Sequence, residues 1–92
     1  MPSILEFLGY KIYFWSNESY EPIHVHISKG SPSENSTKIW ITKVGGCVVA
    51  NNNSNIPINE LNKLLKVISG YYLLICAKWK EYFDTDIIKF YC

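Results

Sequence analysis

The sequence predicts a single α+β domain with two layers, in which a C-terminal helix, either continuous or split at Gly70, packs on one face of an antiparallel sheet of three to four strands. Two patterns carry this prediction. Within residues 10–50, apolar and polar side chains alternate with the period of a half-buried strand. Within residues 59–83, apolar side chains recur at spacings of three and four, as in an amphipathic helix. Strands followed by helices are typical of α+β domains.

Length and composition agree with one compact domain over residues 1–92. The chain is 48% hydrophobic and 15% aromatic, which is enough to close one core. Its formal net charge is +1, and its nine basic residues are all lysine. A general nucleic-acid coat shows a larger basic excess, so we expect any contact with nucleic acid to be local.

The cysteines and the N-terminus bear on the compartment. Cys47, Cys76 and Cys92 form no CxxC pair and predict free thiols in a reducing environment. The apolar run near the N-terminus is interrupted by Glu6, which fits neither a signal peptide nor a membrane span. We therefore expect a cytoplasmic protein without membrane contact.

The strands are expected in the first half of the chain. Residues 4–8 form a short apolar run that either adds an edge strand or lies across the core. The runs 10–15, 23–28, 37–43 and 47–50 are rich in β-branched and aromatic residues, and turn-forming residues separate them. The asparagine-rich stretch 51–55 predicts an exposed loop.

The helix is expected to begin after Asn59, a plausible N-cap, with Glu60 in the first turn. Gly70 interrupts the apolar stripe at a cost of about 1 kcal/mol relative to alanine, which predicts a kink or a split. Residues 84–86 should end the helix. The apolar tail 87–92 either adds a strand or docks on the domain.

These elements give the sheet two different faces. The face under the helix is apolar, with Ile12, Phe14, Val25, Ile27, Ile39 and Ile41. The opposite face collects lysines, histidines and large aromatic residues: Lys11, Tyr13, Trp15, His24, His26, Lys38 and Trp40. Tryptophans are costly to expose, so we expect RNA bases and phosphates, or a protein partner, to cover this face.

His24 and His26 concentrate the chemistry of the chain. Two residues apart on one strand, their side chains share a face about 6 to 7 Å apart. Three interpretations stay open: two polar residues that hydrogen-bond to neighbours, an acid–base pair acting on a phosphodiester, or a metal site. The metal site lacks a third histidine, and Glu18, Glu21 and Cys47 have no diagnostic spacing. The sequence predicts no metal ligands and no cofactor.

Several ordered blocks give the chain a resemblance to a known family. They are Met1-Pro2, GYKIYFWSNE at 9–18, EPIHVH at 21–26, KIW at 38–40 and AKWKEYF at 77–83. Together they resemble the bacterial DUF4160 family from Met1 to about Phe83. The asparagine-rich loop and the tail 84–92 are longer than the usual ending of the family, and arginine is absent where members often carry it.

The resemblance implies a small bacterial protein with a DUF2442-like partner, because members are frequently encoded beside a DUF2442 protein in an arrangement that resembles a toxin–antitoxin pair. With the paired histidines, it favours a toxin-like ribonuclease or RNA-binding domain, which requires accessible imidazoles. The alternatives are a non-catalytic interaction module, binding its partner or a second copy, and a histidine-based metal-binding protein. In the first hypothesis His24 and His26 are catalytic, Glu18 and Glu21 support them, and the RNA contacts are Lys11, Tyr13, Trp15, Lys38 and Trp40.

Overall fold

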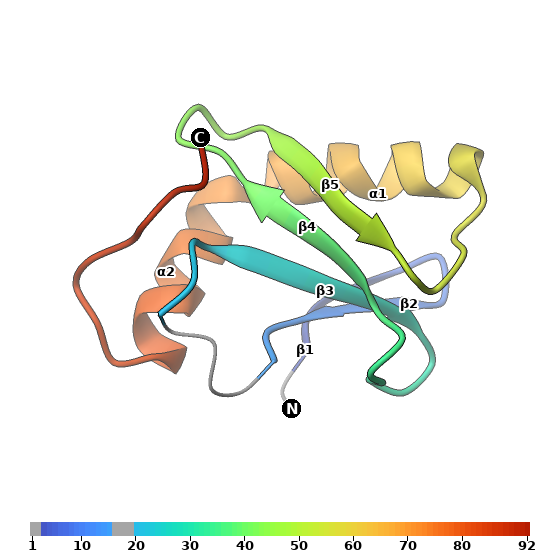
Figure 1. Cartoon of the computed structure of the whole chain (residues 1–92), viewed down its shortest axis with the longest axis horizontal. Helices are drawn as coiled ribbons and strands as arrows, with labels where there is room; N and C mark the ends of the chain where they lie inside the picture. The colour runs from blue at the N-terminus through green and yellow to red at the C-terminus, as the bar shows by residue number, and fades with distance from the viewer. Residues whose placement is uncertain (1–2, 16–19) are drawn as a thin grey trace.

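The computed structural model describes residues 3–15 and 20–92, and Figure 1 shows one antiparallel sheet with two helices packed against it. The α+β class is confirmed. The sheet has five strands in the order β1-β2-β3-β4-β5, where three to four were predicted. The strands are β1 (Ser3–Phe7), β2 (Tyr10–Tyr13), β3 (His24–Lys29), β4 (Thr37–Ile41) and β5 (Cys47–Asn52), and the helices are α1 (Ile58–Gly70) and α2 (Tyr72–Tyr82).

The additional strand is β1, which pairs with β2 as an edge strand. The turn between them consists of Leu8 and Gly9, whose φ angles are 54° and 80°. Positive φ at both central residues is the mark of a type I′ hairpin, whose twist matches that of the flanking strands. The apolar run 4–8 therefore supplies most of an edge strand, and its last residue, Leu8, lies in the tight turn that folds the strand back on β2.

Pairing between strands keeps the two predicted faces apart. Val25 lies opposite Ile39, and Ile12 lies opposite Ile27, on the face covered by the helices. On the other face, His24 lies opposite Trp40 and His26 lies between Tyr13 and Lys38. The predicted core positions are all buried, packed against Leu61, Leu64, Ile68, Ile75 and Trp79.

The helical region is split as the glycine predicted. α1 ends at Gly70 and α2 begins at Tyr72, and the N–H of Tyr71 bonds to the carbonyls of Val67 and Ile68. The predicted N-cap at Asn59 is wrong. α1 already begins at Ile58, because Pro57 at the cap position has a φ of −56° that suits the start of a helix.

The structure corrects the prediction for the asparagine-rich stretch and decides between the two predictions for the tail. β5 continues to Asn52, so Asn51 and Asn52 belong to the strand and not to a loop. The tail 84–92 docks without forming a strand, and Figure 1 shows it returning past the start of β3 to the end of β4. Its carbonyls accept hydrogen bonds from Ile23 N and Lys43 N at 2.8 and 3.0 Å. Among the described helices, none is long and apolar enough to cross a membrane.

Candidate functional site

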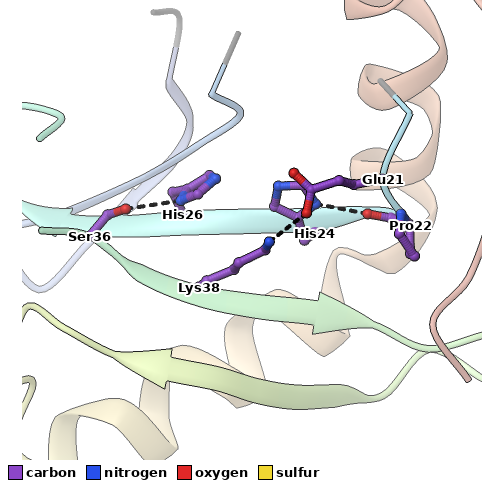
Figure 2. Close-up of polar contacts among 6 residues, drawn as sticks. All are labelled: Glu21, Pro22, His24, His26, Ser36 and Lys38. Carbon is purple, nitrogen blue, oxygen red and sulfur yellow. Dashed lines mark hydrogen bonds and ion pairs between the residues drawn. The ribbon is translucent and has the colours of Figure 1, made fainter. Parts of the chain in front are cut away.

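Strand β3 presents both histidines on the face of the sheet away from α1 (Figure 2). Their ring centroids are 5.0 Å apart, and the rings meet edge to face. The alternation of the strand is the cause, because Val25 and Ile27 point into the core and leave His24 and His26 on the other side. The predicted pair is therefore a contacting pair.

Both imidazoles are buried, against the expectation that they would be accessible. His24 is 1% exposed and His26 is 8% exposed. The ring centroid of His24 lies 5.4 Å from that of Trp40 and 5.6 Å from that of Trp79, a residue of α2. The ring of His26 lies 5.8 Å from that of Tyr13. Large aromatic side chains from neighbouring strands and from α2 thus cover the two imidazoles, which β3 alone would leave exposed to solvent.

Hydrogen bonds fix the orientation of each ring (Figure 2). His24 Nδ1 lies 2.8 Å from the carbonyl oxygen of Pro22. A carbonyl can only accept, so Nδ1 carries the hydrogen, and in the neutral ring Nε2 bears the lone pair. His26 Nδ1 lies 2.9 Å from Ser36 Oγ, and either atom can donate.

An ion pair lies beside the histidines. Lys38 Nζ is 2.6 Å from Glu21 Oε1, with both side chains about four-fifths buried at 19% and 22% exposure. The same ammonium lies 4.3 Å from the ring centroid of Trp40, within the range of a cation–π contact. The ion pair thus holds the Lys38 ammonium and the Glu21 carboxylate together, and the supporting role predicted for Glu21 stays a prediction.

The structure brings most of the predicted site residues together. Tyr13, Trp15, Trp40, Lys38 and Glu21 lie in direct contact with the histidines or with one another. Lys11 lies one step further along the face, opposite Ser28, with its Nζ 4.0 Å from Glu6. Glu18, predicted as a supporting residue, falls outside the described residues.

A cavity of about 210 Å³ opens beside His26. It is lined by Trp15, His26, Ser33, Glu34 and Ser36. Three of these residues come from the loop 30–36, which the sequence identified only as a turn-forming segment. No local pattern marks them, because their place at the site depends on how the loop folds back on the sheet.

Two side chains of the histidine face anchor that loop. Tyr13 Oη lies 2.7 Å from Ser28 Oγ and accepts a hydrogen bond of 3.3 Å from Ser33 N. Ser36 Oγ contacts His26 Nδ1 at the other end of the loop. These contacts hold the cavity wall at both ends, with Glu34 between them.

The tail covers the other end of the same face. Tyr91 stacks on Trp40, with ring centroids 5.1 Å apart and planes at 6°. The backbone bond from Ile23 N to Lys89 O holds the tail next to the start of β3. The Trp40 end of the face is thus covered in part by the chain itself.

Metal ligands and reactive thiols do not gather here in the part of the chain that the structure describes. Among residues 3–15 and 20–92, no three His, Cys, Asp or Glu side chains are grouped so as to hold a metal ion. Cys47 lies on β5, where burial raises the pKa of its thiol to about 11. A thiol that stays protonated at neutral pH is a poor nucleophile and a poor metal ligand.

Comparison with known families gives a match, which covers most of the chain. The model of the family DUF4160, described as a domain of unknown function, matches residues 9–80. The chain belongs to this family. No curated protein and no solved structure matches it. In this DUF4160 protein the matched span contains both histidines, the ion pair and the described residues that line the cavity, whereas the docked tail lies beyond it.

Proposed function

We propose that this DUF4160 protein acts on RNA as the toxin-like component of a two-protein pair, with a DUF2442-like protein as its partner. The observation that carries the proposal is the cavity of about 210 Å³ at the histidine site, whose lining residues bring an indole, an imidazole, two hydroxyl groups and a carboxylate. Single-stranded RNA is bound by such combinations, since bases stack on aromatic rings and polar groups read their edges.

His26 is the histidine suited to face the substrate. It lines the cavity, whereas His24 lies behind it and is almost fully buried. An imidazole exchanges protons near neutral pH, and the contact with Ser36 orients this ring. In cleavage, the 2′-hydroxyl of RNA would attack the adjacent phosphorus and pass its proton to His26, while the departing 5′-oxygen takes a proton from water. His24 acts as a positioning residue through its edge contact with His26.

Induced expression in a bacterial host that lacks the partner tests this proposal. Wild type should arrest growth, and RNA from arrested cells should contain new 5′ ends. His26→Asn should abolish both effects, because the amide cannot take up a proton at neutral pH. Tyr20→Ala serves as the control, since Tyr20 is 72% exposed and contributes nothing to the cavity.

Circular dichroism must show that the His26→Asn protein is folded. The proposal fails if wild type does not arrest growth, or if folded His26→Asn arrests growth as strongly as wild type. Arrest without new RNA ends would exclude RNA cleavage, and a gel-shift titration with single-stranded RNA would then decide whether the protein acts by binding RNA.

A second candidate, a non-catalytic interaction module, is favoured by the edge of the sheet at β5. Val48 and Val49 are 37% and 39% exposed, and no charged residue lies in this strand. An uncharged edge strand can pair with a strand of another chain. That chain would be a second copy of this protein or the DUF2442-like partner. Light scattering can test this function. The molecular mass of wild type should rise with protein concentration, and that of Val48→Lys should stay at the value of a monomer.

A further inference from the structure

We infer that the cavity beside His26 is a guanine pocket, with Glu34 as the residue that determines specificity. The inference rests on the proposed function, because it names the base that an RNA substrate places in the cavity. It is carried by three residues that line the cavity: Glu34 with its carboxylate, Ser33 with its hydroxyl and Trp15 with its indole.

The size of the cavity limits what it can hold. At about 210 Å³ it is smaller than the roughly 300–1,000 Å³ of pockets that enclose drug-sized ligands. This space can enclose one planar base, and the attached ribose would lie at the opening, where its 2′-hydroxyl can approach His26. Trp15 provides an aromatic surface on which such a base can stack.

Glu34 is well placed to read the edge of a base. It sits between Ser33, whose backbone N–H bonds to Tyr13, and Ser36, whose hydroxyl contacts His26. The loop is thus held on both sides of it. Among residues 3–15 and 20–92, Glu34 has no ion-pair partner, so its carboxylate oxygens remain available as acceptors.

The four bases differ in what they offer a carboxylate. Guanine presents two adjacent donors, N1–H and the N2 amino group, which match the two carboxylate oxygens. Adenine and cytosine each present one amino donor beside a ring nitrogen that is itself an acceptor, and uracil presents one N–H between two carbonyls. Bidentate pairing is therefore available only to guanine, and the other bases bring an acceptor against the negative charge.

Ser33 complements this pairing. Its Oγ accepts a hydrogen bond of 3.2 Å from Asn35 N, which leaves the hydroxyl hydrogen free to be donated. Guanine carries a carbonyl at O6, next to N1–H, that can accept it. An acceptor at Glu34 and a donor at Ser33 complement the donors and the acceptor that guanine presents on its Watson–Crick edge.

Titration of the full-length protein with 5′-GMP, 5′-IMP, 5′-AMP and 5′-UMP, followed by NMR, tests the inference. The indole N–H signal of Trp15 reports on the cavity separately from those of Trp40 and Trp79. GMP should bind roughly tenfold more tightly than AMP or UMP, the discrimination expected of one bidentate pair. IMP, which lacks the N2 amino group, should bind several-fold more weakly than GMP because one of the two hydrogen bonds is lost.

Glu34→Gln should remove the preference for GMP while leaving the spectrum of the core unchanged, because the amide replaces one acceptor by a donor. Glu81→Gln is the matched control, because Glu81 lines a different cavity with Phe14 and Tyr82. The Glu81→Gln protein should bind GMP as wild type does. The inference is overturned if GMP is not preferred, or if the preference survives in Glu34→Gln.

The outcome is separable from that of the proposed function. Growth arrest and new RNA 5′ ends that both depend on His26, without a preference for GMP, would keep the action on RNA and reject the guanine pocket. A preference for GMP that depends on Glu34, without growth arrest, would keep the pocket and reject the toxin-like role.

Discussion

The Nδ1–H of His24 donates to the carbonyl oxygen of Pro22, two residues earlier, over 2.8 Å. This bond selects the tautomer of a ring that is only 1% exposed, and it ties the ring to the backbone just before β3. Proline has a fixed φ and no N–H, so its carbonyl is presented from a stiff segment. His24 is thus held as a structural member of the site, with Nε2 as the nitrogen that carries the lone pair when the ring is neutral.

Substitution of His24 should therefore lower stability before it affects any activity. His24→Ala is expected to cost about 2–4 kcal/mol of unfolding free energy, through a cavity between Trp40 and Trp79 and an unpaired carbonyl. His24→Asn should cost about 1 kcal/mol less, because its amide N–H can replace the Nδ1–H donor. Urea denaturation followed by circular dichroism measures both values. Equal losses for the two variants would show that the bond to Pro22 contributes nothing.

The sequence predicted what depends on periodicity. Alternation in β2, β3 and β4 placed Ile12, Val25 and Ile39 in the core and the histidines on the other face, as the structure has them. Gly70 marked the break between the helices. These features are local, since successive side chains of a strand point to opposite faces of the sheet whatever packs on it.

The sequence could not predict what depends on contacts between distant segments. Burial of His24 depends on Trp79, 55 positions later in the chain, and on Trp40 from the neighbouring strand. Glu34 reached the site because Tyr13 and Ser36 anchor its loop, and neither bond leaves a trace in local spacing. Lys38 was expected to contact RNA, and the structure pairs it with Glu21. That role of Lys38 stays a prediction.

The pair formed by Lys38 and Glu21 should contribute measurably to stability. A double-mutant cycle with Lys38→Met and Glu21→Gln is expected to give a coupling energy of about 1 kcal/mol, above most exposed pairs because both side chains are largely buried. The coupling should persist in 1 M NaCl more than that of Lys11 and Glu6, whose side chains are 38% and 66% exposed. A coupling near zero, or equal salt sensitivity of the two pairs, would contradict this expectation.

Removal of the stack between Tyr91 and Trp40 should uncover one end of the histidine face. Tyr91→Ala is expected to lower the unfolding free energy by about 1 kcal/mol and to increase quenching of tryptophan fluorescence by acrylamide, because Trp40 loses the ring that covers it. Tyr20→Ala removes a tyrosine that is 72% exposed and should change neither quantity. Quenching in Tyr91→Ala that matches wild type would show that the tail leaves Trp40 as accessible as before.

Alkaline pH should destabilise the protein through Cys47. Burial raises the pKa of this thiol from 9.0 to about 11, so the folded protein keeps a proton that the unfolded chain releases. The stabilisation is complete below pH 9 and is lost as the pH rises towards 11. We expect a loss of about 1 kcal/mol from this group, since solvent still screens the partly buried thiolate.

Comparison with Cys47→Ala isolates the contribution of this thiol. Burial also raises the pKa of Tyr10, Tyr72 and Cys76, so both proteins should lose stability over the same range of pH. Only the wild type carries the additional loss from Cys47, and its denaturation midpoint should therefore fall further between pH 9 and 11. Parallel midpoints for the two proteins would mean that the thiol ionises in the folded state as readily as in the unfolded chain.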